Sequence, residues 1–159
     1  MGSSMWHALK RYRGLNPEAR KLFHRAAVML PCVRLSLHLR GFKKTAEVLE
    51  KKLRSSVSLR PQTENAATLA QLASHMVKAA GRYGIVRPTC LAESLTLWFL
   101  LKQQGIAADL RIGVRKAAQK FEAHAWVEYA GAALNQTAEQ HLHYAAFDGS
   151  LADLPGEKT

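Results

Sequence analysis

The segment CLAESLTLWFLLKQQG, residues 90–105, decides the fold, because it is apolar on nearly every side when read as a helix. Its large apolar side chains are Leu91, Leu95, Leu97, Trp98, Phe99, Leu100 and Leu101. A helix that is apolar all round belongs in the core of a protein. Glycine commonly follows the last turn of a helix, so we expect a buried helix that ends at Gly105.

Beyond Gly105 the apolar residues recur at every second position, which is typical of strands. ADLRIGVRK, residues 108–116, alternates Leu110, Ile112 and Val114 with Arg111, Gly113 and Arg115. KFEAHAWVEYAG, residues 120–131, continues this pattern, and Ala130-Gly131 fits a two-residue hairpin turn. We expect AALNQ (132–136) to return as the next strand and AAFDG (145–149) to add a short edge strand.

The first half of the chain favours helices. Asn16 fits an N-cap and Pro17 the first helical position. Pro31 is expected to interrupt this helix and to begin a second one that stops at Gly41. Amphipathic segments over 42–53 and 64–84 predict two more helices, the last of which ends at Gly81. The predicted fold class is therefore α+β, with a helical N-terminal half and one buried helix packed on a small antiparallel sheet.

Positive charge is concentrated at the start of the chain. The net charge is +11 over 159 residues. Residues 1–60 hold 14 Lys/Arg against 3 Asp/Glu, whereas residues 61–159 hold nine of each. We therefore divide the chain into a basic helical region, 1–60, and a core, 61–159, within one compact unit. A basic face of this kind suits an acidic protein, an acidic peptide or nucleic acid, and we favour the first two over nucleic acid. The alternative is a solvated helical surface that binds no partner.

Other classes of protein are disfavoured by the sequence. No apolar run reaches the roughly 18 residues that a membrane span needs, and the first residues lack the apolar stretch of a signal peptide. We therefore expect a cytoplasmic protein in which Cys32 and Cys90 are free thiols. The chain has no CxxC or HxxxH pattern and no glycine-rich phosphate loop, and His141 with His143 is a weak pair. We expect neither a metal nor an organic cofactor.

Cys90 is the cysteine to which chemistry can be assigned. It follows Thr89, a candidate cap, at the expected start of the buried helix. A helix N-terminus favours a thiolate, and its unpaired N–H groups can stabilise an oxyanion. The alternative is a buried structural cysteine. Cys32 lies in the middle of a helix, where we expect it to act as a small hydrophobic residue.

His124 is the matching base in the expected sheet. A lone histidine in a strand is usually structural, but a poised cysteine upstream makes a Cys–His nucleophile possible. Such a pair needs a group that orients the imidazole. A two-residue turn places Asn135 on the face of His124, diagonal to it, whereas a three-residue loop would present Gln136 instead. Asp148 is a third alternative.

These residues resemble a known family. TCLAESLTLWFLLKQQGIAADLRIGVRK followed by AHAWVEYAG is similar to the transglutaminase-like cysteine proteases that act as leader peptidases in lasso-peptide biosynthesis. The front segment LNPEARKLFHRAAVMLPCVRLSLHLRGF is similar to that family's helical region, so the resemblance covers about residues 10–147. It implies a transglutaminase/papain-like core and a Cys–His–Asp triad with Cys90 as nucleophile and His124 as base. Where the family usually has Asn-Asp, this chain has Asn135-Gln136, which leaves Asn135 or Asp148 as the third member.

The resemblance also implies an activity and its partners. It implies a cysteine endopeptidase, the stand-alone protease of a split system, that removes the leader from a ribosomally made precursor peptide. A separate leader-binding partner protein presents the precursor, and an ATP-dependent macrolactam synthetase closes the ring. Two alternatives stay open: a transglutaminase-like acyl transferase, and a catalytically weak basic adaptor protein.

Overall fold

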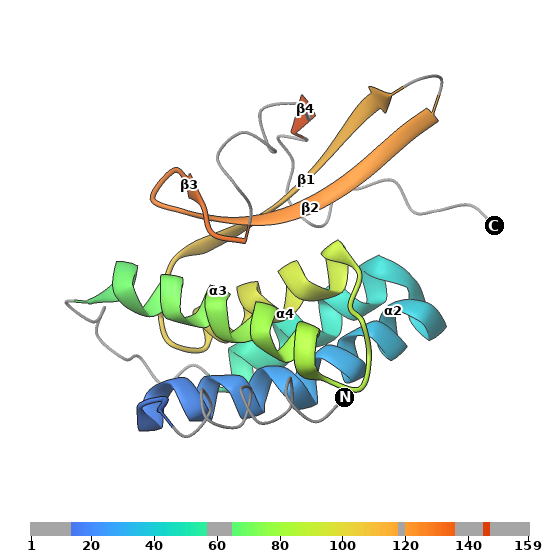
Figure 1. Cartoon of the computed structure of the whole chain (residues 1–159). Helices are drawn as coiled ribbons and strands as arrows, with labels where there is room; N and C mark the ends of the chain where they lie inside the picture. Colours follow the sequence, from blue (N-terminus) through green and yellow to red (C-terminus); the bar gives the residue numbers. More distant parts are fainter. Residues whose placement is uncertain (1–13, 57–64, 118–119, 136–144, 147–159) are drawn as a thin grey trace, which may run out of the picture.

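The computed structural model describes residues 14–56, 65–117, 120–135 and 145–146, in which a group of helices lies under a sheet (Figure 1). The helices are α2 (Pro17–Ser56), α3 (Ala66–Tyr83) and α4 (Cys90–Lys102). The strands are β1 (Ala108–Ala117), β2 (Lys120–Tyr129), β3 (Ala132–Ala133) and β4 (Ala145–Ala146). The predicted α+β class is confirmed. None of the helices in these ranges combines the length and apolarity that crossing a membrane requires.

Helix α2 begins as the sequence indicates but continues through a proline. Asn16 caps it, because its side-chain Oδ1 accepts from Ala19 N at 2.7 Å. Pro31 lies inside the helix, so the predicted break at this residue is wrong. Proline removes one helical hydrogen bond, but Leu30 and Val33 beside it are buried in the core and hold the helix together.

The break in α2 lies at Gly41, as predicted. Gly41 has φ 73° and ψ 179°, which is non-helical, and a positive φ is costly for residues with a Cβ. The glycine divides α2 into a first arm, residues 17–40, and a second arm, residues 42–56. The two arms enclose the cavity described below.

Helix α3 runs past the residue at which we expected it to end. Gly81 is buried inside the helix, and the last helical residue is Tyr83. A Cβ on Gly81 would lie 2.8 Å from Pro88 Cγ, so this glycine allows a close approach of the segment before α4. The helix is closed by Gly84, whose N–H donates to Ala80 O at 2.8 Å.

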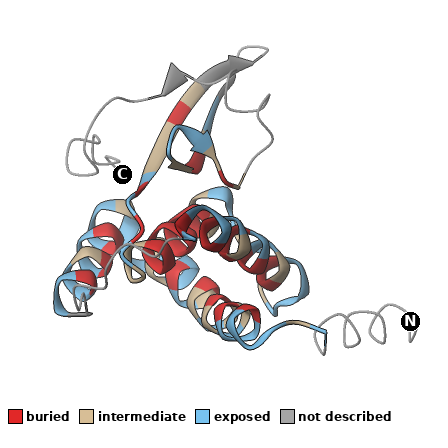
Figure 2. Cartoon of the chain, turned by 90° about the vertical axis from the view of Figure 1, so that its left-hand side faces the viewer, coloured by how far each residue is buried: buried red, intermediate tan, exposed pale blue. Residues whose placement is uncertain are grey.

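Helix α4 is the centre of the core, as its composition predicts. Its side chains from Ser94 to Leu101 are buried, and Figure 2 shows the buried residues concentrated among the helices. The helix ends at Lys102, three residues before the predicted end at Gly105. Gly105, with φ 74°, lies in the turn that follows, where Ile106 N donates to Leu101 O at 3.0 Å. The core cluster draws residues from α2, α3, α4 and the sheet. The division of the chain at residue 60 stays a prediction.

The sheet is antiparallel with the strand order β3-β2-β1-β4. Ala130 (φ 49°) and Gly131 (φ 77°) form the turn between β2 and β3, where Tyr129 pairs with Ala132. This confirms the two-residue turn. In the other pairing of β2, His124 lies opposite Gly113 of β1. Of the predicted edge strand 145–149, the first two residues form β4, and the rest lie outside the described residues.

Candidate functional site

Cys90 is the first residue of α4, and its side chain is exposed. The predicted cap is confirmed, because Thr89 Oγ1 accepts from Ala92 N at 3.3 Å. The first intrahelical hydrogen bond runs from Glu93 N to Thr89 O at 3.0 Å. The N–H groups of Cys90 and Leu91 precede this bond and point out of the helix end. An exposed thiol and two backbone donors therefore share this end of α4.

The segment before Cys90 is held from two sides. Arg34 of α2 donates from Nη1 to the carbonyl oxygen of Arg87. Pro88 packs against α3 at Gly81, where even a methyl group would be too close. These contacts tie the start of α4 to both other helices and therefore fix where the Cys90 thiol lies.

Ser94 attaches the same end of α4 to the sheet. Cys90 and Ser94 are four residues apart and therefore share one face of the helix. Ser94 is fully buried, and its hydroxyl donates to the carbonyl oxygen of Ala125 at 2.9 Å. Ala125 is the neighbour of His124 in β2. Ser94 thus joins the Cys90 face of α4 to the backbone of β2 next to His124. The side chains of β2 that pack on the helical core are Val127 and Tyr129, which alternate with His124 and point to the other face of the strand.

Cys90 is displaced from the hydrogen bond between Ser94 and Ala125 in the direction of His124 along β2. The residue Ala108, shortly after α4, pairs with Tyr129 at the end of β2, so α4 and β2 run toward the same end of the molecule (Figure 1). Four residues of helix correspond to about 6 Å, and one or two strand residues to about 3–7 Å. Cys90 is therefore displaced from Ser94 toward His124, although no hydrogen bond joins these two described residues.

His124 is half-buried on the sheet face that it shares with Trp126. The two rings are stacked, with centroids 6.4 Å apart and an interplanar angle of 21°. Gly113 lies directly opposite His124 and presents no side chain that would compete for the space beside the imidazole. Trp126, which is 2% exposed, therefore forms one wall of the space that the imidazole occupies.

Trp126 is held by a carboxylate that the sequence reasoning did not identify. Its indole Nε1 donates to Glu128 Oε1 at 2.8 Å. The other oxygen, Oε2, accepts from Arg111 Nε at 3.0 Å across the strand pair. His124, Trp126 and Glu128 are alternate residues of one strand, and Arg111 pairs with Trp126. The alternation along β2 could be read from the sequence, whereas the register that brings Arg111 beside Trp126 is known only from the structure.

Asn135 bridges β2 and α4. Its Oδ1 accepts from Val127 N at 2.8 Å, and its Nδ2 donates to Ser94 Oγ at 2.8 Å. The chain leaves the sheet here, since the carbonyl of Leu134 accepts instead from Ser74 Oγ of α3 at 2.7 Å. Leu134 N still donates to Val127 O at 2.9 Å, so Asn135 Oδ1 takes the place that the Leu134 carbonyl oxygen would have in a continued antiparallel pair. Its predicted role as the partner of the His124 imidazole stays a prediction.

Glu93 is an ionisable group in the first turn of α4. Burial raises the pKa of its carboxyl, and the positive charge of Lys78 on α3 partly opposes this shift. Glu93 lies three residues from Cys90, where a carboxylate is favoured by the helix dipole. The sequence reasoning did not single it out, because its burial depends on the packing of α3 against α4.

The remaining predicted residues cannot be placed. Gln136, Asp148, His141 and His143 lie outside the described residues. Among the residues that are described, no three His, Cys, Asp or Glu side chains are grouped so that they could hold a metal ion. Cys32 and Cys90 are both free thiols, as expected, but Cys32 is exposed rather than packed as a small hydrophobic residue.

The comparisons with known proteins give one result. The family model of the transglutaminase-like superfamily matches residues 29–147, a span that contains both Cys90 and His124. Neither the curated proteins nor the solved structures yield a match. The chain therefore belongs to the transglutaminase-like superfamily, whose members are generally cysteine proteases and acyltransferases.

Proposed function

We propose that this protein is a cysteine endopeptidase that removes the leader peptide from a ribosomally made lasso-peptide precursor. One observation carries the proposal: the exposed thiol of Cys90 stands at the capped start of α4, on the helical face that Ser94 attaches to β2 beside His124. Membership of the superfamily supports thiol chemistry at this place. The restriction to leader removal rests on the resemblance of the sequence motifs described above.

In the proposed mechanism Cys90 is the nucleophile. Its sulfur attacks the carbonyl carbon of the peptide bond between leader and core, and the oxyanion that forms is stabilised by the backbone N–H groups of Cys90 and Leu91. His124 takes the thiol proton and delivers it to the leaving amine as the C–N bond breaks. The acyl group stays on sulfur as a thioester. His124 then accepts a proton from water, whose oxygen attacks the thioester and releases the second product.

The surroundings of His124 suit a general base. The stacked Trp126 ring covers one side of the imidazole, and Glu128 with Arg111 holds the indole in place. A base held by packing needs little reorganisation when the substrate binds. The group that fixes its tautomer is Asn135 or Asp148 in this proposal, with Gln136 as the further alternative.

The protease acts with partners in this proposal. A separate leader-binding protein presents the precursor peptide, and an ATP-dependent macrolactam synthetase consumes the freed core peptide. The reaction at Cys90 itself uses no ATP. Cleavage by the protein together with the leader-binding partner is therefore expected in a mixture that lacks both ATP and the synthetase.

Acyl transfer is the second candidate, because the superfamily also contains acyltransferases. Both reactions pass through the same thioester and differ only in the nucleophile that resolves it. Hydrolysis adds the elements of water to the products, whereas transfer adds an amine. Mass spectrometry of the products in the presence of a primary amine distinguishes the two.

The test is reconstitution of the purified protein with the leader-binding partner and the precursor. Cys90→Ala and His124→Ala should each abolish formation of the free leader, while Cys32→Ala, the matched control at the second thiol, should not. If Cys90→Ala retained wild-type processing, the protein would be an adaptor and the proposal would fail.

A further inference from the structure

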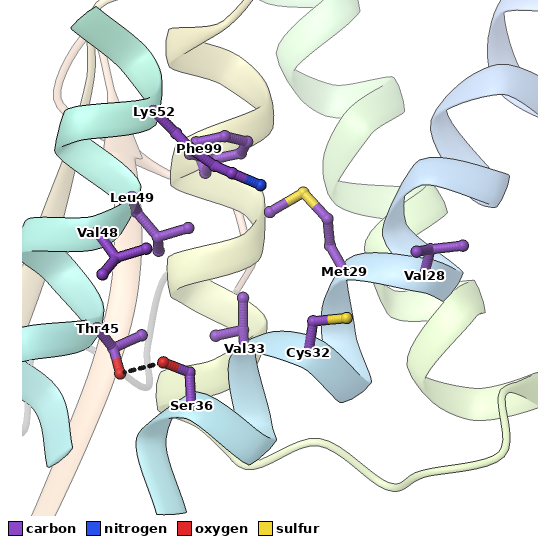
Figure 3. A pocket seen from close by; sticks show the side chains of 10 residues that line it. All are labelled: Val28, Met29, Cys32, Val33, Ser36, Thr45, Val48, Leu49, Lys52 and Phe99. Carbon is purple, nitrogen blue, oxygen red and sulfur yellow. Dashed lines mark hydrogen bonds between the residues drawn. The ribbon is translucent and has the colours of Figure 1, made fainter. Parts of the chain in front are cut away.

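A cavity of about 250 Å³ lies between the two arms of α2 and is bordered by α4 (Figure 3). Its lining comes from the first arm (Val28, Met29, Cys32, Val33, Ser36), the second arm (Thr45, Val48, Leu49, Lys52) and Phe99 of α4. Phe99 follows Cys90 by nine residues, which at 3.6 residues per turn places it on the opposite side of the helix. This groove is therefore separate from the candidate active site.

The groove is apolar and has one closed end. The hydroxyl of Ser36 donates to Thr45 Oγ1 at 2.9 Å where the two arms meet (Figure 3). Thr45 in turn donates to the carbonyl of Gly41, the residue at which α2 bends. The polar groups at the closed end are thus paired, and the rest of the lining is mainly apolar. An occupant gains free energy here chiefly by burying apolar side chains.

The apolar surface extends beyond the groove. Val28, Leu35 and Leu39 are 66%, 58% and 69% exposed. They follow one another at spacings of seven and four residues, so they form a single stripe along the first arm, next to Cys32. Val48, 40% exposed, lines the groove from the second arm. A row of exposed aliphatic side chains that borders an apolar groove is typical of a surface for another macromolecule.

The charge beside the groove is positive. Lys44, Lys51 and Lys52 lie four residues before, three after and four after Val48, so they flank it on one face of the second arm. All three are exposed, and Lys52 lines the groove itself. Glu47 and Glu50 occupy other faces of the same arm. A ligand that lies along Val48 therefore meets lysines and not glutamates.

We propose that this groove docks an acidic amphipathic helix of a partner protein. Its apolar side chains would enter between the arms, against Phe99 and the Val28–Leu39 stripe, and its carboxylates would face Lys44, Lys51 and Lys52. The stripe spans 11 residues, or about 17 Å of helix, which is too long for a small molecule and matches about three turns of an amphipathic helix. The proposal does not depend on the reaction at Cys90.

The direct test uses three synthetic helices of about 17 residues with a fluorescent label. The first has leucines at i, i+3, i+4 and i+7 spacing and flanking glutamates; the second has the same leucines with lysines; the third keeps the glutamates but has serines for leucines. Fluorescence anisotropy should detect binding of the first peptide only, and added salt should weaken it. Equal binding of the lysine peptide, or no binding of the first, would overturn the proposal.

Two matched variants locate the lysines that matter. Lys44→Glu with Lys52→Glu reverses two charges beside the groove, whereas Lys43→Glu with Arg54→Glu reverses two on the other side of the same arm. All four residues are exposed. The first pair should weaken binding of the acidic peptide about tenfold at low salt, and the second pair about threefold or less. Equal effects of the two pairs would mean that only net charge matters and would exclude the groove.

Cys32 reports occupancy directly. The chain has two cysteines, so in a Cys90→Ala protein the exposed Cys32 of the groove is the single thiol. Saturating acidic peptide should slow its reaction with a thiol reagent at least tenfold, while the serine peptide should not. An unchanged rate would place the peptide elsewhere. If wild-type protein is instead a dimer that Leu39→Ser dissociates, measured by light scattering, the occupant is a second copy and the proposal is wrong.

Discussion

The amide Nδ2 of Asn135 donates a hydrogen bond to Ser94 Oγ over 2.8 Å, which joins the end of the hairpin to the second turn of the buried helix. The hydroxyl of Ser94 in turn donates to Ala125 O, so the helix is bonded to both the hairpin end and β2. The other atom of the amide, Oδ1, accepts from Val127 N. These bonds give Ala125 O and Val127 N partners on the edge of β2 where β3 has ended. The site is thus built on a buried polar network between helix and strand.

Replacing Asn135 by alanine should therefore lower stability. The substitution leaves Val127 N–H without its acceptor and Ser94 Oγ without a donor, and each buried unsatisfied group costs about 1–3 kcal/mol. We expect a loss of about 2 kcal/mol in the free energy of unfolding, measured with urea. Asn135→Asp keeps an acceptor for Val127 N–H and should lose less. If Asn135→Ala lowered turnover with no loss of stability, Asn135 would act on His124 alone.

The coupling between Ser94 and Asn135 can be measured separately. Ser94→Ala removes the acceptor of Asn135 Nδ2 and the donor to Ala125 O. Because the two side chains share one network, the double variant Ser94→Ala/Asn135→Ala should be less destabilised than the sum of the single variants by about 1 kcal/mol. Full additivity would show that the two side chains do not interact in solution.

Features that depend on local chemistry could be predicted from the sequence, whereas the network of Ser94 and Asn135 could not. Asn16, Gly41 and the Ala130-Gly131 turn each follow from local chemistry, and the structure confirms them. Strand alternation predicts the face of Asn135 only if the strand continues to it, but β3 ends at Ala133, and beyond this residue alternation no longer determines where a side chain points. Ser94 was missed because a serine in an apolar helix gives no local signal of its partner. Its role depends on the edge of β2 that packs against it.

Pro31 and Gly81 show that helix ends, too, cannot be predicted from local sequence where tertiary packing decides them. Both residues usually break helices, and both lie inside helices here. Leu30 and Val33 are buried around Pro31, and Gly81 meets Pro88 at a distance that no larger residue would allow. Tertiary packing offsets the cost of about 1 kcal/mol for glycine and about 3 kcal/mol for proline in a helix.

The hydrogen bond between Glu128 and Trp126 should contribute more to stability than the ion pair between Glu128 and Arg111. Glu128→Gln keeps a carbonyl oxygen that accepts from the indole N–H and loses only the ion pair, whose side chains are 35% and 22% exposed. A partly exposed pair contributes about 1 kcal/mol or less. Glu128→Ala leaves the buried indole N–H unpaired and should cost about 1–3 kcal/mol. Urea unfolding should therefore rank wild type, Glu128→Gln and Glu128→Ala in this order, and equal loss in both variants would contradict the assigned roles.

Glu93 should make stability depend on pH. Burial raises the pKa of its carboxyl in the folded protein, against the opposing effect of Lys78, so the folded state binds this proton more tightly than the unfolded state does. The resulting stabilisation is present below the ordinary pKa of 4.5 and is lost as the pH rises through the folded-state pKa. Glu93→Gln should therefore be more stable than wild type at pH 7, and the difference should vanish below about pH 4.

Lys78 provides the control for this titration. Lys78→Met removes the charge that favours ionised Glu93, so it should destabilise the protein at pH 7 and raise the pKa of Glu93 further. In a Glu93→Gln protein the same Lys78→Met change should have little effect, because the carboxylate is absent. A similar loss in both backgrounds would assign the effect of Lys78 to packing on α3 rather than to its charge.

Gly81 links the packing of α3 to the position of Cys90. In Gly81→Ala the new methyl group would meet Pro88 Cγ at 2.8 Å, and Pro88 is two residues before Cys90. The strain should cost about 1–3 kcal/mol of stability and should displace the start of α4, so the proposed cleavage should slow as well. Pro88→Ala removes the atoms that the methyl group meets. The double variant Gly81→Ala/Pro88→Ala should therefore be less destabilised than the sum of the two single variants, and additive losses would show that the glycine is not required for this approach.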